Sequence, residues 1–281
     1  MGARAARCGD IVHPFVKCPE SRGCAKGEFL LFVGHDDRLD AGFLAIVDEL
    51  IRRSPDAALF TTHFRLIDAR GRVLRRFRPM PARETMVELL ASRSMGRRDM
   101  ASLGVVMRSS AYDTVGGLPP FEGLAYAEDA LWLRLMDGSW KATAPEEAYS
   151  YRVRLEGAFL SLRWRSAIAA MERYARFVES LGHTHPDATE VWRTHAPAFL
   201  ERRYRFVMLA AMLAAGNGSG RFGAREREEA LASLARLSPE AAHRLRRRWW
   251  FRVGSRLPRW PLPAPALACL QAYWLYRRRW R

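Results

Sequence analysis

Apolar residues fall into short continuous runs and helical repeats along the first half of the chain. The run Leu30–Val33 is typical of a strand buried on both faces. Residues 41–53 then carry apolar side chains at helical spacing, and a Ser-Pro-Asp turn stops that pattern. Apolar runs at 58–67 and 73–77 flank residues with turn chemistry, which predicts a hairpin. This order predicts an α/β fold.

The pattern changes along the chain, and it predicts four segments. Further elements of the α/β part are a helix at 82–92 and a strand-like run at 103–107. Later apolar periodicity is helical, at 159–181, 197–215 and 225–237, with His183 and His185 in a loop between the first two. We therefore expect an irregular segment at 1–25, an α/β domain at 26–156, a helical region at 157–245 and a basic, aromatic tail at 246–281.

Two adjacent carboxylates, Asp36 and Asp37, follow the first strand-like run. In open α/β sheets, ligands bind beyond the carboxyl ends of the strands. Neighbouring carboxylates offer the oxygen ligands that Mg²⁺ and Mn²⁺ prefer, and such ions also bind phosphate oxygens. A solvated turn after a strand is the alternative, and the pair by itself does not decide between the two.

A second acidic pair, Glu128 and Asp129, begins an amphipathic helical pattern at Ala127. The exposed N–H groups and the dipole of a helix N-terminus favour an ionised carboxylate there. Such a carboxylate at the mouth of a cleft can act as a general base towards a hydroxyl. Simple capping of the helix by the same side chains is an equally good interpretation of this piece alone.

Taken in order, these segments resemble the family 2 glycosyltransferases, which have the GT-A nucleotide-sugar-binding fold. The resemblance runs from about Lys26 to Arg154. Its pieces are AKGEFLLFVGHDD, ALFTTHFRLIDARGRVLR, GVVMRSSAYDTVGGLPP, YAEDALWLRL and YSYRVR. It implies a Rossmann-like α/β core of GT-A type that is followed here by a C-terminal helical region.

The resemblance also implies roles for the two acidic pairs. Asp37 resembles the ligand of the divalent ion, Mn²⁺ or Mg²⁺, and Asp36 its partner near the ribose or the metal. Asp129 resembles the base that deprotonates the acceptor hydroxyl. Glu128 would support it or contact the acceptor.

Three further residues lie in or near these motifs. His35 could approach the donor phosphates, although a histidine in a loop is more commonly a surface residue. Arg152 belongs to an element that resembles the family's Tyr-Arg motif, and it could contact phosphate or acceptor because its planar fork suits oxyanions. A structural ion pair is the alternative for Arg152. Many family members have Asp where this chain has Gly34, so the motif here is xDD rather than DxDD.

The activity implied is inverting transfer of a sugar from a nucleoside-diphosphate sugar to a hydroxyl, without a covalent sugar intermediate. The expected acceptor is a saccharide or lipid-linked glycan of the cell envelope. The family normally begins with βα units of about 30 residues each, whereas 25 residues precede Lys26 and show no strand and helix alternation. We therefore expect an N-terminally incomplete core. The alternative function is a truncated, inactive glycosyltransferase-like protein or a basic membrane-surface module.

The net charge of +16 is concentrated near the end of the chain, where arginines alternate with tryptophans. Arginine beside tryptophan suits the interface of an anionic membrane. Packing on the fold and nucleic-acid binding are the alternatives, and the composition favours nucleic acid least. Four cysteines without metal-binding spacing and the lack of an apolar leader predict a cytoplasmic protein, peripheral on the inner face of the membrane.

Overall fold

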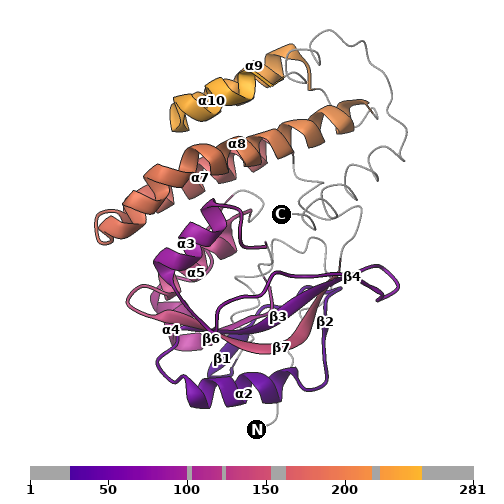
Figure 1. Ribbon diagram of the computed structural model, residues 1–281, viewed down its shortest axis with the longest axis vertical. Coiled ribbons are helices and arrows are strands. Elements are labelled where there is room, and N and C mark those ends of the chain that lie inside the picture. Colours follow the sequence, from indigo (N-terminus) through magenta and orange to yellow (C-terminus); the bar gives the residue numbers. More distant parts are fainter. Residues whose placement is uncertain (1–25, 100–102, 122–124, 153–162, 217–221, 249–281) are drawn as a thin grey trace. The chain divides into compact units, whose positions relative to one another are not determined.

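The computed structural model describes residues 26–99, 103–121, 125–152, 163–216 and 222–248 (Figure 1). The chain divides into two compact units, residues 1–154 with 176–192, and residues 155–175 with 193–281. Our expectations for residues 1–25, for most of the C-terminal tail and for its membrane contact lie outside the described residues. Among those described, no helix combines the length and the apolar character that a membrane span requires.

A mixed sheet forms the centre of the first unit. Its strands run in the order β1-β6-β3-β7-β2, with β4 paired to β3 and β5 paired to β7. Only the central pair β3 and β7 is parallel, and every other pairing is antiparallel. The strands are β1 (Phe29–Leu31), β2 (Arg38–Leu39), β3 (Leu59–Ile67), β4 (Val73–Arg76), β5 (Arg83–Thr85), β6 (Val105–Arg108) and β7 (Trp140–Arg152).

Helices cover both faces of this sheet (Figure 1). On one face lies α2 (Phe43–Arg53), which packs on β3 and β7, and on the other lie α3 (Met86–Ser94) and α5 (Ala127–Leu135). The short helix α4 (Ser109–Thr114) follows β6 directly. Phe43, Phe60 and Tyr149 are fully buried in the core between α2 and the sheet. Burial of such large side chains contributes about 1.5–3 kcal/mol each.

The predicted hairpin is confirmed as β3 and β4, with Arg65 opposite Arg76. Its turn is built on Asp68, whose carboxylate accepts the backbone N–H groups of Arg70 and Arg72, each at 2.9 Å. Gly71 takes a φ of +81° in this turn, a conformation that costs glycine little. The hairpin matters for the site because β3 continues beside β7 up to Arg152.

Two sequence-based expectations in this unit were wrong. The strand after Gly27 is β1, and it is not buried on both faces, since only Leu30 is buried and Val33 is 43% exposed. The helix expected from residue 82 begins at Met86, because the three residues before it form strand β5. Thr85 and Glu88 then form a capping box that fixes the start of α3.

The second half of the chain is helical, as predicted. Its helices are α7 (Trp164–Leu181), α8 (Pro186–Gly216), α9 (Ala224–Leu237) and α10 (Pro239–Arg246). The helix expected from Pro197 begins at Pro186, so Pro197 lies inside it. In the second unit, Tyr204 on α8 and Ser233 on α9 are joined by a 2.7 Å hydrogen bond between their hydroxyls.

Candidate functional site

Asp37 is held by the far end of β7, although the two segments are more than a hundred residues apart. Its Oδ1 accepts the backbone N–H of Arg152 at 2.9 Å, and its Oδ2 accepts the hydroxyl of Tyr149. Its own N–H donates to the carbonyl of Gly34 at 3.0 Å, which closes a tight turn after β1. The carboxylate therefore has a fixed position at the carboxyl end of β1.

Two opposing effects act on the pKa of Asp37. Burial raises its pKa, whereas the hydrogen bonds from Tyr149 and Arg152 act to lower it. Burial and the charge of Asp37 both raise the pKa of Tyr149, so this phenol stays protonated and donates its hydrogen to the carboxylate. A cation beside Asp37 would offset the cost of burying this ionised group.

The turn leaves no room for a side chain at Gly34. A Cβ at Gly34 would lie 2.6 Å from Oδ2 of Asp37 and 3.3 Å from a methyl of Leu103. An aspartate at this position would therefore displace the carboxylate that Tyr149 holds. The close turn of this loop takes the space that the first acid of a DxDD motif would need.

Arg152 ties the acidic loop to the β3–β4 turn. Its Nε donates to the carbonyl of Asp36 at 2.7 Å, and its Nη1 donates to the carbonyls of Asp68 at 2.7 Å and Ala69 at 3.0 Å. Arg152 therefore makes structural contacts with backbone carbonyls, in place of the ion pair that was the alternative. Among the described residues no ion pair of Arg152 is seen. The guanidinium fixes the backbone around both predicted carboxylates.

His35 and Asp36 lie at the open side of the same loop. The imidazole Nδ1 of His35 is 3.8 Å from Oδ1 of Asp36, and the His35 side chain is 49% exposed. Asp36 is only partly exposed. Both side chains remain near solvent, where a ligand can approach them.

The second acidic pair occupies the first turn of α5, as predicted, but its two members have different surroundings. Asp129 is buried and forms an ion pair with Arg93 of α3, which also donates to the carbonyl of Asp99 at 3.1 Å. Its carboxylate is thus not a simple helix cap. Tyr126, just before the helix, has a φ of +64°, the only positive value for a non-glycine among the described residues, and such strain is characteristic of functional turns.

Glu128 keeps part of its surface exposed. Burial of its carboxyl raises its pKa to about 7, and the charge of Asp129 adds to that increase while the charge of Arg93 opposes it. An acid with this pKa is half ionised at neutral pH. That is the range in which a carboxylate acts well as a general base.

Tyr151 feels the charges of both acidic pairs, Asp36 with Asp37 and Glu128. Its pKa is raised first by burial and then by the charges of Asp37, Asp36 and Glu128. The three carboxylates therefore lie within electrostatic range of one phenol on β7. The charges of Asp36, Asp37 and Glu128 thus all act on Tyr151, whereas Asp129 forms its ion pair with Arg93.

Sequence reasoning missed two residues of this arrangement, Tyr149 and Arg93. Tyr149 lies two residues before Tyr151 on β7, and alternate residues of a strand share a face, so a tyrosine pair at this spacing was an available signal. Arg93 gave no such signal, because its partner Asp129 is far away in sequence and the two meet only when α3 packs beside α5.

Asp36 and Asp37 offer part of the donor set that a divalent ion needs. Within the part of the chain that the structure describes, no three His, Cys, Asp or Glu side chains gather closely enough to hold a metal by themselves. Mg²⁺, however, is commonly held by one or two carboxylates together with substrate phosphates. Asp36 and Asp37 fit that donor set, since each carboxylate oxygen has more than one lone pair.

No protein-family model matches the chain, and no curated protein sequence matches it. Its fold is similar to that of S. aureus TarS. The structure of TarS 1–349 in complex with UDP-GlcNAc has a TM-score of 0.53 and 14% identity, over 80% of this chain and 61% of that chain. A second TarS structure has a TM-score of 0.50 and 15% identity, over 80% of this chain and 37% of that chain. This chain thus spans less than two thirds of the length of these proteins, and the likeness confirms the predicted α/β fold.

Proposed function

We propose that this protein is a family 2-type glycosyltransferase that transfers a sugar from a nucleoside-diphosphate sugar to a hydroxyl group, with inversion at the anomeric carbon. The observation that carries the proposal is the fixed position of Asp37, whose two carboxylate oxygens accept hydrogen bonds from the Tyr149 hydroxyl and the Arg152 N–H, next to Asp36 in the same loop. Asp36 and Asp37 lie in the loop after β1 and Glu128 lies at the start of α5, two of the places where the sequence resembles the family.

In this proposal the loop after β1 faces the diphosphate of the donor. Asp36 and Asp37 would hold Mn²⁺ or Mg²⁺ together with phosphate oxygens, and the ion would neutralise charge that develops on the departing nucleoside diphosphate. The protein's contribution is a rigid carboxylate: the hydroxyl of Tyr149 and the N–H of Arg152 fix both oxygens of Asp37. His35 stands beside Asp36 as a further donor to phosphate.

The proton of the acceptor goes to a carboxylate at the start of α5. The acceptor oxygen forms a bond to the anomeric carbon while the bond to the diphosphate breaks, and its proton leaves to the base. The family resemblance points to Asp129, but this side chain is buried and paired with Arg93. We assign the base to Glu128, which is partly exposed and has a pKa of about 7, and we assign to Asp129 the role of positioning α3 against α5.

The charge of the chain bears on the acceptor. A saccharide or lipid-linked glycan of the cell envelope agrees with a strongly basic chain that can approach an anionic membrane surface. The donor site rests on the contacts of Asp37 and is the part of the proposal to test first.

The deciding experiment is calorimetric titration of UDP and UDP-GlcNAc into the full chain, with and without Mn²⁺. The ligand in the TarS complex is the reason for choosing uridine nucleotides. We expect binding that requires Mn²⁺ and is lost in Asp37→Asn but kept in Asp48→Asn, a matched change on exposed α2. A folded protein that binds no nucleoside diphosphate would support the alternative, a glycosyltransferase-like protein without activity.

A further inference from the structure

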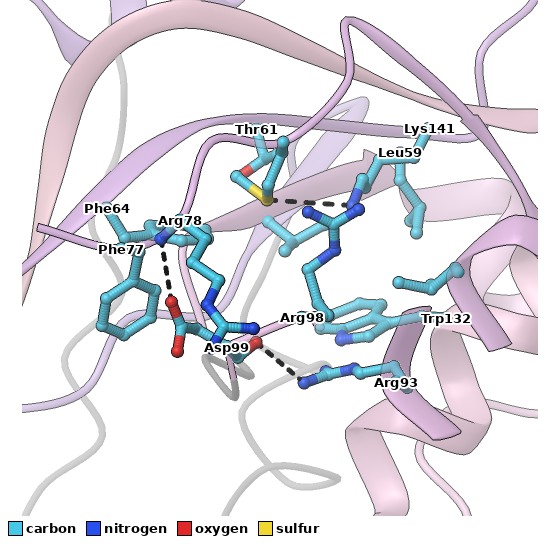
Figure 2. Close-up of a pocket in the computed structure, with 13 residues that line it drawn as sticks. Leu59, Thr61, Phe64, Phe77, Arg78, Arg93, Arg98, Asp99, Trp132 and Lys141 are labelled. Carbon is cyan, nitrogen blue, oxygen red and sulfur yellow. Dashed lines mark hydrogen bonds between the residues drawn. The ribbon is translucent and has the colours of Figure 1, made fainter. Parts of the chain in front are cut away.

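A cavity of about 30 Å³ lies between the sheet and helices α3 and α5 (Figure 2). One part of its wall is apolar, with Leu59, Phe64 and Phe77. The other part carries the basic side chains of Arg78, Arg93, Arg98 and Lys141. A single water needs about 10–15 Å³, so the space exceeds what one water fills.

Positive charge outnumbers negative charge around this cavity. Glu84 is the shared partner of Lys141, at 2.5 Å, and of Arg98. One buried carboxylate thus neutralises one of two buried cations. Lys141 and Arg98 are 5% and 8% exposed, so water screens the remaining charge poorly.

The other ion pairs around the cavity do not remove this excess of positive charge. Asp99 binds Arg75 through both carboxylate oxygens, at 3.1 and 3.3 Å, while Asp129 binds Arg93. The guanidinium of Arg78 donates to backbone carbonyls of residues 96 and 97, and within the described residues it has no carboxylate partner. Among the described residues, ion pairs around the cavity join Arg75, Arg93, Arg98 and Lys141 to three carboxylates, Asp99, Asp129 and Glu84, with Glu84 shared by two cations.

Buried N–H groups in the cavity wall also have no hydrogen-bond acceptor among the described residues. The Nε of Arg98 and the indole Nε1 of Trp132 are buried and make no hydrogen bond to any described residue. Trp132 is 3% exposed, so bulk solvent does not reach it freely. A buried donor without an acceptor costs about 1–3 kcal/mol. A negative ligand that accepts hydrogen bonds would satisfy both the positive charge and the buried N–H donors of the cavity.

We propose that this cavity, between Arg98, Trp132 and Lys141, is a binding site for a phosphate-class oxyanion, either a free ion or the phosphate group of a larger molecule. Arginine suits this ligand because its planar fork matches the geometry of phosphate oxygens. Water can accept the same hydrogen bonds but does not offset the positive charge that remains when Arg98 and Lys141 share Glu84. The site contains neither Asp36 nor Asp37, and the proposal stands independently of the donor site.

The test is a titration of the full chain with sodium phosphate at an ionic strength held constant with sodium chloride, followed by calorimetry and by the midpoint of thermal unfolding. We expect saturable binding and a rise in the midpoint of about 5–10 °C at one hundred times Kd. Glycerol phosphate in a parallel titration distinguishes the two sources: tighter binding than inorganic phosphate means that the site takes the phosphate group of a larger molecule.

Arg98→Met is the main variant, because Glu84 keeps Lys141 as a partner after this change. We expect its Kd for phosphate to rise at least about tenfold. Arg52→Met, the same change on the exposed face of α2, should leave Kd unchanged. Trp132→Phe removes a donor without changing charge and should weaken binding several-fold.

Two results would overturn the proposal. One is the lack of a saturable response of the wild-type chain to phosphate, which would mean that the cavity holds water. The other is equal binding by Arg98→Met and Arg52→Met, which would place the phosphate elsewhere on this basic surface. Phosphate binding that persists in Asp37→Asn separates this site from the donor loop.

Discussion

Arg93, in the last turn of α3, and Asp129, in the first turn of α5, form an ion pair in which each side chain is only 7% exposed. The pair joins the two helices that cover one face of the sheet (Figure 1). Asp129 belongs to the acidic pair of the proposed catalytic site, and Arg93 lines the basic cavity, so the ion pair connects the two sites. Its energetics are therefore the first property to test.

Arg93→Met is expected to lower the free energy of unfolding by about 3–5 kcal/mol, because Asp129 then remains as a buried charge without its partner. Urea unfolding followed by circular dichroism measures this loss. Arg52→Met, which removes an exposed ion pair, should cost less than about 1 kcal/mol. The double variant Arg93→Met/Asp129→Leu should recover part of the loss, and a double variant as unstable as the sum of the singles would contradict the pairing.

Glu128→Gln is expected to remove transfer activity while the fold remains. Only the ionised carboxylate can accept a proton, so kcat/KM of the wild type should rise with pH around the pKa of about 7. The variant should lose that dependence along with most of its rate, at least about a hundredfold. Donor hydrolysis and transfer measured from pH 5.5 to 8.5 provide the check. If Asp129→Asn, and not Glu128→Gln, removes the pH dependence, the base is Asp129.

The stability of the protein should rise with pH between about 8 and 10. Burial lowers the pKa of Lys141 from 10.5 to about 8, with Glu84 opposing that shift. Because the unfolded chain then binds this proton more tightly than the folded chain, the free energy of unfolding increases as pH rises through this window. The full difference corresponds to at most about 3 kcal/mol.

Lys141→Met is the matched test, and its unfolding free energy should lack this rise. Above pH 10 the direction reverses, because burial raises the pKa of Tyr149 and of Tyr151 and the unfolded chain then releases their protons first. An equal slope in the wild type and in Lys141→Met between pH 8 and 10 would mean that another group is responsible.

Gly34→Asp, which completes the DxDD motif, is expected to weaken the site. The new Cβ would lie 2.6 Å from Oδ2 of Asp37, so the carboxylate must leave the hydroxyl of Tyr149. We expect a loss of about 1–3 kcal/mol in unfolding free energy and weaker nucleotide binding.

Gly42→Asp is the matched control for that substitution. A Cβ at Gly42 meets nothing within 4 Å, and Gly42 is the N-cap of α2, where aspartate is favourable. This variant should be at least as stable as the wild type in the same urea experiment. A Gly34→Asp protein with improved stability and Mn²⁺-dependent binding would show that the loop adapts to a second acid.

Part of the fold followed from local pattern. The hairpin β3–β4 was predicted because Asp68, Gly71 and the apolar runs beside them are all local signals. The start of α5 was likewise predicted from Glu128 and Asp129 at the head of an apolar repeat. The start of α3 was not, because strand β5 owes its state to pairing with β7, a partner more than fifty residues away.

The sequence by itself singled out the residues that we propose carry the chemistry: the carboxylates after β1, those at the start of α5, and the Tyr-Arg element at the end of β7. Residue type and position along one element are local properties, and a strand end or a helix N-terminus can be recognised from them. Only the tertiary structure decided their roles. Tyr149 fixes Asp37, Arg93 removes Asp129 from solvent, and Glu128 is left with a pKa near neutrality, because burial and charge depend on groups that packing brings together from distant parts of the chain.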